Sequence, residues 1–399
     1  MKISRRALMA AAAASAAMLA GAPVSAADDV IKIGNTMPYS GPASAYGQIG
    51  KTIAAYFEMV NANGGVNGRK IEFISYDDAY SPPKTVEQVR RLVEQDEVDL
   101  LYATLGTPTN TAIHKYVNAK KVPHLFVATG ASKWNDPENF PWTTGWQPNY
   151  PTEGAIYAQW ILANIENPKI AVLYQNDDYG KDYLHGLKSG LGGKVDEVLI
   201  AEAPYEVAQP TVDSEVLNLQ SSGANVFFIV ATPKFAAQAI KKSAEIGWKA
   251  ERFLNNVSIS VGSVLKPAGL EASKGLISAG YLMEADDPQW KDDANLLAWR
   301  EFMNKWYPDG DQTSSFTVFG YSSAWTMVET LKQAGDDLSR ENIMKAASSL
   351  KGAPAPLLLP GITINTSATD HAPIEAMQLM RFNGESWERF GEVVHAESS

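Results

Sequence analysis

The stretch VIKIGNTMPYSGP, residues 30–42, decides the fold class of this 399-residue chain. Residues 30–37, VIKIGNTM, are rich in apolar and β-branched side chains, which favours a strand. Proline, serine and glycine mark a turn at 38–42, and a helical segment at 45–61 follows, ended by Asn-Gly-Gly at 63–65. A strand that runs through a turn into a helix is the start of a βαβ unit, so the stretch predicts an α/β protein with a parallel sheet.

The same alternation continues through the first third of the chain. Further strands are predicted at residues 70–76, 98–104 and 122–128, and further helices at 82–95 and 108–119. A Pro- and Trp-rich stretch at 136–151 then interrupts the pattern. The segments before this interruption are enough for one doubly wound lobe.

A second alternation begins with a predicted helix at 152–165. Strands are predicted at 169–175, 194–201, 224–230 and 252–256, with helices between them at 180–191, 211–221 and 235–246. Thr-Pro follows a strand and precedes a helix twice, at 107–108 and 232–233, so the two halves share a local pattern. The sequence therefore predicts two doubly wound parallel-sheet lobes.

The last part of the chain lacks the strands that an independent domain would need. A strand at 276–282 is predicted to precede helices at 290–306, 317–334 and 340–350, and short strands at 361–366, 375–382 and 387–394. We expect three crossings between lobes, near residues 147, 281 and 358. The predicted N-terminal lobe is 27–147 with 282–358, and the C-terminal lobe is 148–281 with 359–399. A three-strand hinge of this kind leaves a cleft where ligands bind.

The N-terminus carries the pattern of a secretory signal peptide. Residues 1–26 open with Lys2, Arg5 and Arg6, continue through an Ala-rich apolar run, and close on Val-Ser-Ala. The run is too short and too rich in alanine for a spanning helix, and no second apolar run of about 20 residues follows. We expect cleavage before Ala27 and a periplasmic protein. The two arginines leave both the general secretory and the twin-arginine export routes open.

Composition excludes several classes of function. The chain has 34 Lys plus Arg against 45 Asp plus Glu, a net charge of -11, which argues against a nucleic-acid partner. It has no cysteine, which excludes disulfides, Cys-ligated metals and thiol nucleophiles. The five histidines are scattered, and no nucleophile, base and orienting group form a recognisable set. We therefore expect no enzymatic activity, no metal and no cofactor. The paired aspartates are best explained by turns and helix N-termini.

Several motifs together resemble one known family. The chain reads NTMPYSGP at 35–42, VNANGGVNG at 60–68, YDD at 76–78, NDDYG at 176–180 and EIG at 245–247. In this combination it resembles, over essentially the whole mature chain, the periplasmic solute-binding proteins of branched-chain amino-acid-type ABC importers. The resemblance implies a type I, Venus-flytrap fold in which a solute enters the cleft, the lobes close, and the closed form docks on a membrane permease. A monomer is expected.

The resemblance also assigns ligand-binding positions. These are Tyr46, Thr107, Ala128, Thr129, Gly130, Tyr150, Tyr179 and Asn256. Thr107 is expected to hold the ligand carboxylate at a helix N-terminus. Gly130 stands where the family has threonine, so the adjacent Thr129 is the residue that can offer a hydroxyl. Tyr46, Tyr150 and Tyr179, with Tyr39, are expected to flank a flat or long ligand.

Two departures from the family bear on the ligand. Asn256 aligns with the acidic residue that pairs with an α-ammonium group, and Ala231 aligns with an aromatic residue. A buried ammonium group without a carboxylate partner is unfavourable, so we expect a small carboxylic acid, aromatic acids included. A branched-chain amino acid or a short amide is the alternative ligand, and a periplasmic sensor module is the alternative role.

Overall fold

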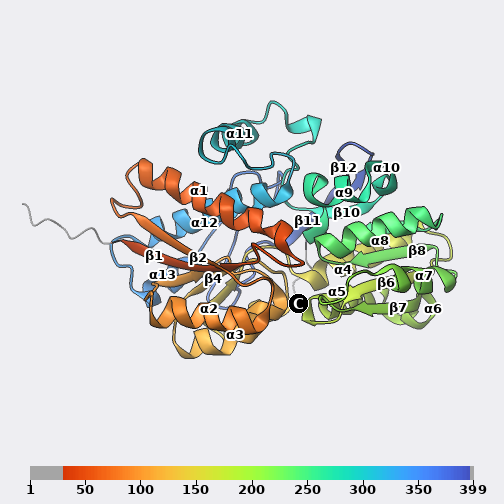
Figure 1. Cartoon of the computed structure of the whole chain (residues 1–399), viewed down its shortest axis with the longest axis horizontal. Helices are drawn as coiled ribbons and strands as arrows, with labels where there is room; N and C mark the ends of the chain where they lie inside the picture. Colours follow the sequence, from red (N-terminus) through yellow and green to blue (C-terminus); the bar gives the residue numbers. More distant parts are fainter. Residues whose placement is uncertain (1–29, 396–399) are drawn as a thin grey trace, which may run out of the picture.

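The computed structural model describes residues 30–395, which form two lobes built on separate sheets (Figure 1). The first lobe has a parallel five-stranded sheet in the order β2-β1-β3-β4-β5. Its strands are β1 (Ile31–Met37), β2 (Ile71–Asp77), β3 (Leu100–Tyr102), β4 (His124–Val127) and β5 (Thr143–Gly145). Its helices are α1 (Gly47–Ala62) packed on α12 (Ser315–Ala334), and α2 (Pro82–Glu94) packed on α3 (Thr107–Ala119). The two helix pairs lie on opposite sides of the sheet (Figure 1).

The second lobe has a seven-stranded sheet in the order β12-β11-β10-β9-β8-β6-β7. Its strands are β6 (Ile170–Gln175), β7 (Leu199–Tyr205), β8 (Val226–Val230), β9 (Glu251–Leu254), β10 (Ile277–Gly280), β11 (Ala376–Phe382) and β12 (Trp387–His395). Helix α4 (Tyr150–Asn164) packs on α5 (Asp178–Leu191), and α7 (Asp213–Ser221) on α8 (Pro233–Glu245). Strands β6 to β10 are parallel, whereas β11 and β12 are antiparallel additions. The predicted fold of two doubly wound lobes is confirmed.

The apolar pattern explains the central strands. All five residues of β8, VFFIV, are buried, as expected for a parallel strand covered by helices on both faces. Polar side chains cap some of the helix starts: Asp177 accepts hydrogen bonds from the N–H groups of Tyr179 and Gly180, and Asp293 caps α11 (Ala294–Trp306). These aspartates belong to the paired acidic residues that the sequence analysis assigned to turns and helix N-termini.

The chain passes between the two sheets after β5, after β10 and again before β11. The second and third of these segments lie side by side, because Leu282 forms an antiparallel bridge with Leu358. The Met283 N–H donates to the Leu357 carbonyl at 2.7 Å, and the Leu359 N–H donates to the Tyr281 carbonyl at 2.9 Å. The two segments are therefore joined by backbone hydrogen bonds. The division of the chain into lobes at residues 147, 281 and 358 stays a prediction.

Two element predictions were wrong in detail, and one strand was missed. Residues 361–366 form no strand; a single bridge joins Ile364 to Ala353, and Gly361 has a φ of 89°. The strand predicted at 194–201 lies at Leu199–Tyr205, because residues 195–198 form one turn of helix, α6 (Val195–Val198). Strand β5, Thr143–Gly145, was not predicted. The signal-peptide prediction, residues 1–26, lies outside the described residues.

Candidate functional site

A cavity between the lobes is the candidate site. Its free space, counted together with the part open to solvent, is about 700 Å³. Residues that follow the carboxyl ends of strands line it from both lobes: Tyr80, Gly106 and Ala128 from the first, and Thr232 and Asn256 from the second. This is the edge at which parallel sheets of α/β proteins bind ligands.

Aromatic side chains form most of the cavity wall. Five tyrosines line it: Tyr46, Tyr80, Tyr150, Tyr179 and Tyr281. Phe316 and Phe319, near the N-terminus of α12, complete the aromatic wall. Edge-to-face contacts fix the rings, with centroids 4.9 Å apart for Tyr46 and Phe316, and 5.2 Å apart for Tyr150 and Tyr179. Such a wall suits an apolar or aromatic ligand body.

The N-terminus of α3 is the polar feature of the first lobe at this cavity. Gly106, with a φ of 98°, precedes the helix, and no side chain caps the helix start. Gly106 is required there because a Cβ would clash with the Tyr80 ring and Thr109 Oγ1. Thr107 opens the helix and lines the cavity, with its Oγ1 2.6 Å from Thr129 Oγ1. An uncapped helix start beside a hydroxyl is suited to binding a carboxylate.

At the starts of two second-lobe helices, the capping side chains accept hydrogen bonds from the free backbone N–H groups. Asn149 accepts from the Thr152 N–H at the start of α4, and Asp177 accepts from two N–H groups at the start of α5. These helix starts therefore offer a ligand less than α3 does.

One acidic residue lining the cavity was missed by sequence reasoning. Glu284 is only 6% exposed and follows the bridged segment after β10. Burial, with the nearby charges of Asp286 and Asp287, raises the pKa of its carboxyl to about 8. Within residues 30–395 the cavity lining includes no Lys, Arg or His side chain. Glu284 is the ionisable carboxyl group of the lining in that part of the chain.

A second buried carboxyl, that of Glu153 in α4, lies behind the cavity wall. Its oxygens accept hydrogen bonds from Tyr157 at 2.7 Å, from Tyr183 at 2.6 Å and from the Asn256 N–H at 2.7 Å. Burial raises its pKa to about 7, against these hydrogen bonds, which lower it. The Asn256 side chain is also engaged, because its Nδ2 donates to the Ala279 carbonyl at 2.5 Å. Glu153 thus holds the cavity wall in place.

Six of the eight predicted site residues line the cavity. They are Tyr46, Thr107, Ala128, Tyr150, Tyr179 and Asn256. Thr129 and Gly130 instead line a smaller neighbouring hollow that includes His371. Tyr39 lies elsewhere, with its hydroxyl 2.6 Å from Ser75 Oγ, and Ala231 is buried outside the lining. The placement brings most of the predicted residues together; their roles toward a ligand stay predictions.

Several lining residues were not predicted, and position in the chain explains why. Gln147, Tyr281 and Glu284 come from the segments that cross between lobes, where no periodicity marks an inward face. Tyr80 and Thr232 follow β2 and β8, so their place after a parallel strand is a signal that could have identified them.

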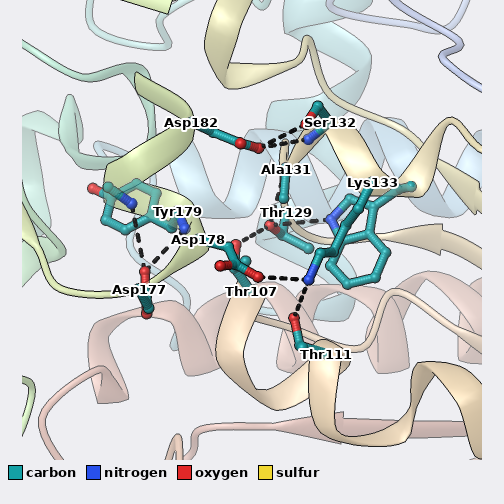
Figure 2. Close-up of polar contacts among 12 residues, drawn as sticks. Thr107, Thr111, Thr129, Ala131, Ser132, Lys133, Asp177, Asp178, Tyr179 and Asp182 are labelled. Atoms are coloured by element: carbon teal, nitrogen blue, oxygen red, sulfur yellow. Dashed lines mark hydrogen bonds and ion pairs between the residues drawn. The ribbon is translucent and has the colours of Figure 1, made fainter. Parts of the chain in front are cut away.

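The lobes contact each other directly at the rim beside α5. Lys133 Nζ lies 2.6 Å from Asp178 Oδ2, and the Ser132 N–H donates to Asp182 Oδ2 at 2.7 Å. Figure 2 shows Lys133 and Ser132 reaching these two aspartates near Thr107 and Thr129. On another side of the cavity, the Tyr46 hydroxyl donates to the Val257 carbonyl at 3.1 Å. These contacts join the two lobes on either side of the cavity.

Residues 30–395 contain neither a metal-binding cluster nor a membrane-spanning helix. No group of three or more His, Cys, Asp or Glu side chains there is placed to hold a metal ion. None of the helices in that range combines the length and apolar character needed to cross a bilayer.

Comparison with known proteins gives one family. A family model described as periplasmic binding protein matches residues 30–386. A Leu/Ile/Val-binding protein homolog from Brucella abortus is 26% identical over 339 residues, covering 82% of this chain and 84% of that protein.

Solved structures share the fold. A branched-chain amino acid ABC transporter protein from Thermus thermophilus with bound valine has a TM-score of 0.83 at 14% identity, covering 92% of this chain and 97% of that one. A solute-binding protein from R. palustris in complex with benzoate has a TM-score of 0.76 at 19% identity, covering 92% and 98%.

Proposed function

We propose, from the premise that this chain belongs to the type I periplasmic binding proteins of the branched-chain amino-acid family, that it is the solute receptor of an ABC importer. The receptor captures its solute in the cavity between the lobes and delivers it to a membrane permease. The cavity and the backbone pairing of the crossing segments support this role, since closure about paired crossings encloses a ligand. It acts as a periplasmic monomer that binds its solute without catalysis.

The proposed solute is a small carboxylate with an apolar or aromatic body. The single observation that carries this proposal is the uncapped start of α3, with the Thr107 hydroxyl, inside an aromatic-walled cavity. The helix start offers partial positive charge to the carboxylate, while the tyrosine and phenylalanine rings contact the rest of the molecule. Structural neighbours with bound valine and with benzoate are consistent with a carboxylate ligand of this size.

An amino acid is the second candidate. The sequence argument against it was the absence of a carboxylate partner at Asn256 for an ammonium group. Glu284 supplies a carboxyl group from a different position in the same cavity. An ammonium-bearing ligand would therefore meet a carboxyl group in the cavity, at a position other than that of the family's acidic residue.

A ligand screen on the mature protein tests the proposed function. Thermal unfolding is measured with amino acids, aliphatic acids, aromatic acids, amides and sugars, and positive ligands are titrated by calorimetry. A ligand at about 100 times its Kd stabilises the folded state by about 2.7 kcal/mol, which raises the melting temperature. We expect carboxylates to raise it and matched amides to have little effect. Stabilisation by uncharged sugars or amides alone would contradict the carboxylate proposal.

Removal of the proposed signal peptide can be measured separately. We propose that residues 1–26 are removed and that the periplasmic protein begins at Ala27, because small residues occupy both recognition positions before it. Mass spectrometry of the exported protein should give this N-terminus. An exported protein that retains Met1 would contradict it.

A further inference from the structure

Residues 260–266 lie against residues 311–315, and we call the contact between these two segments the seam. The first segment follows β9 of the second sheet and includes a short helix, η5 (Val261–Leu265), which packs on α8. The second segment leads into α12, which packs on α1 of the first lobe. The seam therefore joins the two lobes beside Ser315 and Phe316, which line the cavity.

The two backbones approach each other closely at the seam. The Gly262 N–H donates to the Thr313 carbonyl at 3.1 Å. Hydroxyl groups lie on both sides of this hydrogen bond, since Ser314 Oγ is 3.2 Å from Ser260 Oγ and 3.2 Å from Ser263 Oγ. Short side chains of this kind let the two segments meet through their backbones.

Gly262 permits this approach because it has no side chain. A Cβ at this position would clash with Asp311 Oδ2 and Thr313 Oγ1. These two side chains are held in place: Asp311 Oδ1 accepts from the Thr313 N–H at 2.8 Å and from the Thr313 hydroxyl at 2.7 Å. The Thr313 hydroxyl also accepts from Lys266 Nζ at 3.1 Å. An alanine at position 262 would therefore push the two segments apart.

The second lobe itself does not require glycine at position 262. The φ of Gly262 lies outside the left-handed region that favours glycine. The three atoms nearest to a Cβ there all belong to Asp311 and Thr313, in the opposite segment. Alanine also stabilises a helical backbone better than glycine does. The approach of the first lobe thus accounts for a glycine that is unfavourable for its own helix.

The seam also contains a buried acceptor without a partner. Gln48, in the first turn of α1, donates through Nε2 to Ser263 Oγ at 3.1 Å. Its Oε1 is buried and accepts no hydrogen bond from another residue in 30–395. An unmet buried acceptor is unfavourable, and water would satisfy it once the segments separate. This cost keeps the joined arrangement from being strongly favoured, as a contact that forms and breaks requires.

We infer that Gly262 is a positioning residue for solute binding, because it lets the lobes close until their backbones meet at the seam. The inference rests on the proposed function, in which closure encloses the solute. Gly262 is not among the residues that line the cavity, so it acts without touching the solute. A contact that stabilises the closed arrangement alone changes the affinity for every solute by the same factor and leaves their ranking unchanged.

The test compares the full mature protein with Gly262→Ala. Gly193→Ala is the matched control, because Gly193 also lies in the second lobe, its φ is outside the left-handed region, and no atom lies within 4 Å of the Cβ that the substitution adds. Calorimetry and stopped-flow kinetics with benzoate and with valine give the Kd and the dissociation rate of each protein.

A distance measurement reports on the seam without any solute. The chain has no cysteine, so spin labels can be attached at Glu58→Cys in α1 and Lys241→Cys in α8 alone. Both positions are exposed, and the two helices carry opposite sides of the seam (Figure 1). Pulsed electron resonance then gives the distribution of distances between the labels, with and without each probe.

We expect Gly262→Ala to shift this distribution towards longer distances. It should raise the Kd of both probes about 10-fold, the effect of losing about one hydrogen bond from the closed arrangement, mainly through faster dissociation. The ratio of the two Kd values should stay the same. Gly193→Ala should change none of these quantities. Unliganded Gly262→Ala should unfold at no lower temperature than the parent protein, because alanine suits the helix.

Removing the obstructing atoms should rescue the variant. Asp311→Ala combined with Thr313→Ala deletes the side-chain atoms that a Cβ at position 262 would meet. In that background Gly262→Ala should change the Kd less than about twofold, because the two sides of the seam are coupled only through the clash.

Other outcomes overturn the inference in distinguishable ways. Unchanged distances and Kd values in Gly262→Ala, a changed ranking of the probes, a clearly lower melting temperature, or a loss that persists in the rescue background would each remove Gly262 from this role and leave the receptor intact. A parent protein that never shows the shorter distance would do the same. If neither probe binds, the proposed carboxylate function fails, while the label distances of the unliganded proteins still decide the role of Gly262.

Discussion

Replacing Thr107 by valine tests the proposed carboxylate site at a single hydroxyl group. Valine keeps the branched shape of threonine and removes its Oγ1, which lies 2.6 Å from Thr129 Oγ1. Thr129 retains the Tyr150 hydroxyl at 3.3 Å and the Trp134 Nε1 at 3.4 Å. The substitution therefore leaves no buried polar group without a partner, and we expect little change in the free energy of unfolding.

The expected effect on binding follows from the charge of the ligand group. A hydrogen bond to a charged group contributes about 1.5–3 kcal/mol, so Thr107→Val should raise the Kd for a carboxylate about 10- to 100-fold. The helix start itself remains, because the backbone N–H groups and Gly106 are unchanged. We expect binding to be weakened and not abolished.

Calorimetry of the parent protein and the variant with the tightest carboxylate from the ligand screen makes this measurement. Thr109→Val is the matched control, because its hydroxyl lies in the same helical turn, donates to the Leu105 and Gly106 carbonyls, and does not line the cavity. The control should lower the melting temperature and leave the Kd nearly unchanged. A Thr107→Val protein with unchanged affinity would remove Thr107 from the site and refute the reasoning from the start of α3.

The remaining predictions concern the rim, the wall and pH. Lys133→Met removes the ion pair with Asp178, whose two side chains are 33% and 48% exposed. Because solvent screens such a pair, we expect it to contribute only about 0.2–1 kcal/mol to closure of the lobes. The variant should have a Kd raised less than about fivefold, and its Kd should depend less on salt concentration. Asn256→Glu places a carboxylate opposite the Ala279 carbonyl and beside Glu153, so it should lower the melting temperature and weaken acid binding; unchanged values of both would contradict this. The pKa of Glu153, raised to about 7, means that the native carboxyl binds its proton more tightly than the unfolded one does. The protonated carboxyl therefore adds about 3 kcal/mol to the free energy of unfolding below about pH 4.5, and this contribution is lost as the pH rises through about 7. Glu153→Gln should reduce the pH dependence of the free energy of unfolding, measured with denaturant.

The fold could be predicted largely from local patterns. The buried run of β8 and the Thr-Pro pairs at the starts of α3 and α8 are features of a few adjacent residues, and the structure places them where the pattern indicates. Strand β5 was not predicted, because three residues in a Pro- and Trp-rich stretch show no periodicity. Residues 361–366 have strand-like composition, but pairing depends on a neighbouring strand, and only Ile364 finds a partner there.

The site could be predicted only in part. Residues at the ends of parallel strands, such as Ala128 and Asn256, are found because the topology brings those ends together. Glu284 is set by the crossing segment, whose position depends on its pairing with Leu357 about 70 residues later in the chain. No local pattern carries such a long-range contact. The family motifs therefore point to Asn256 and not to the Glu284 carboxyl that lines the cavity.

The antiparallel strands β11 and β12 impose an order on how this chain is made. Ile277 of β10 pairs with Arg381 of β11, so the second sheet is incomplete until the last residues have been synthesised. A chain that stops before Ala376 would leave β10 as a bare strand edge, a template for pairing with other chains. C-terminal truncations that remove β11 and β12 should therefore be prone to aggregation through the exposed edge of β10.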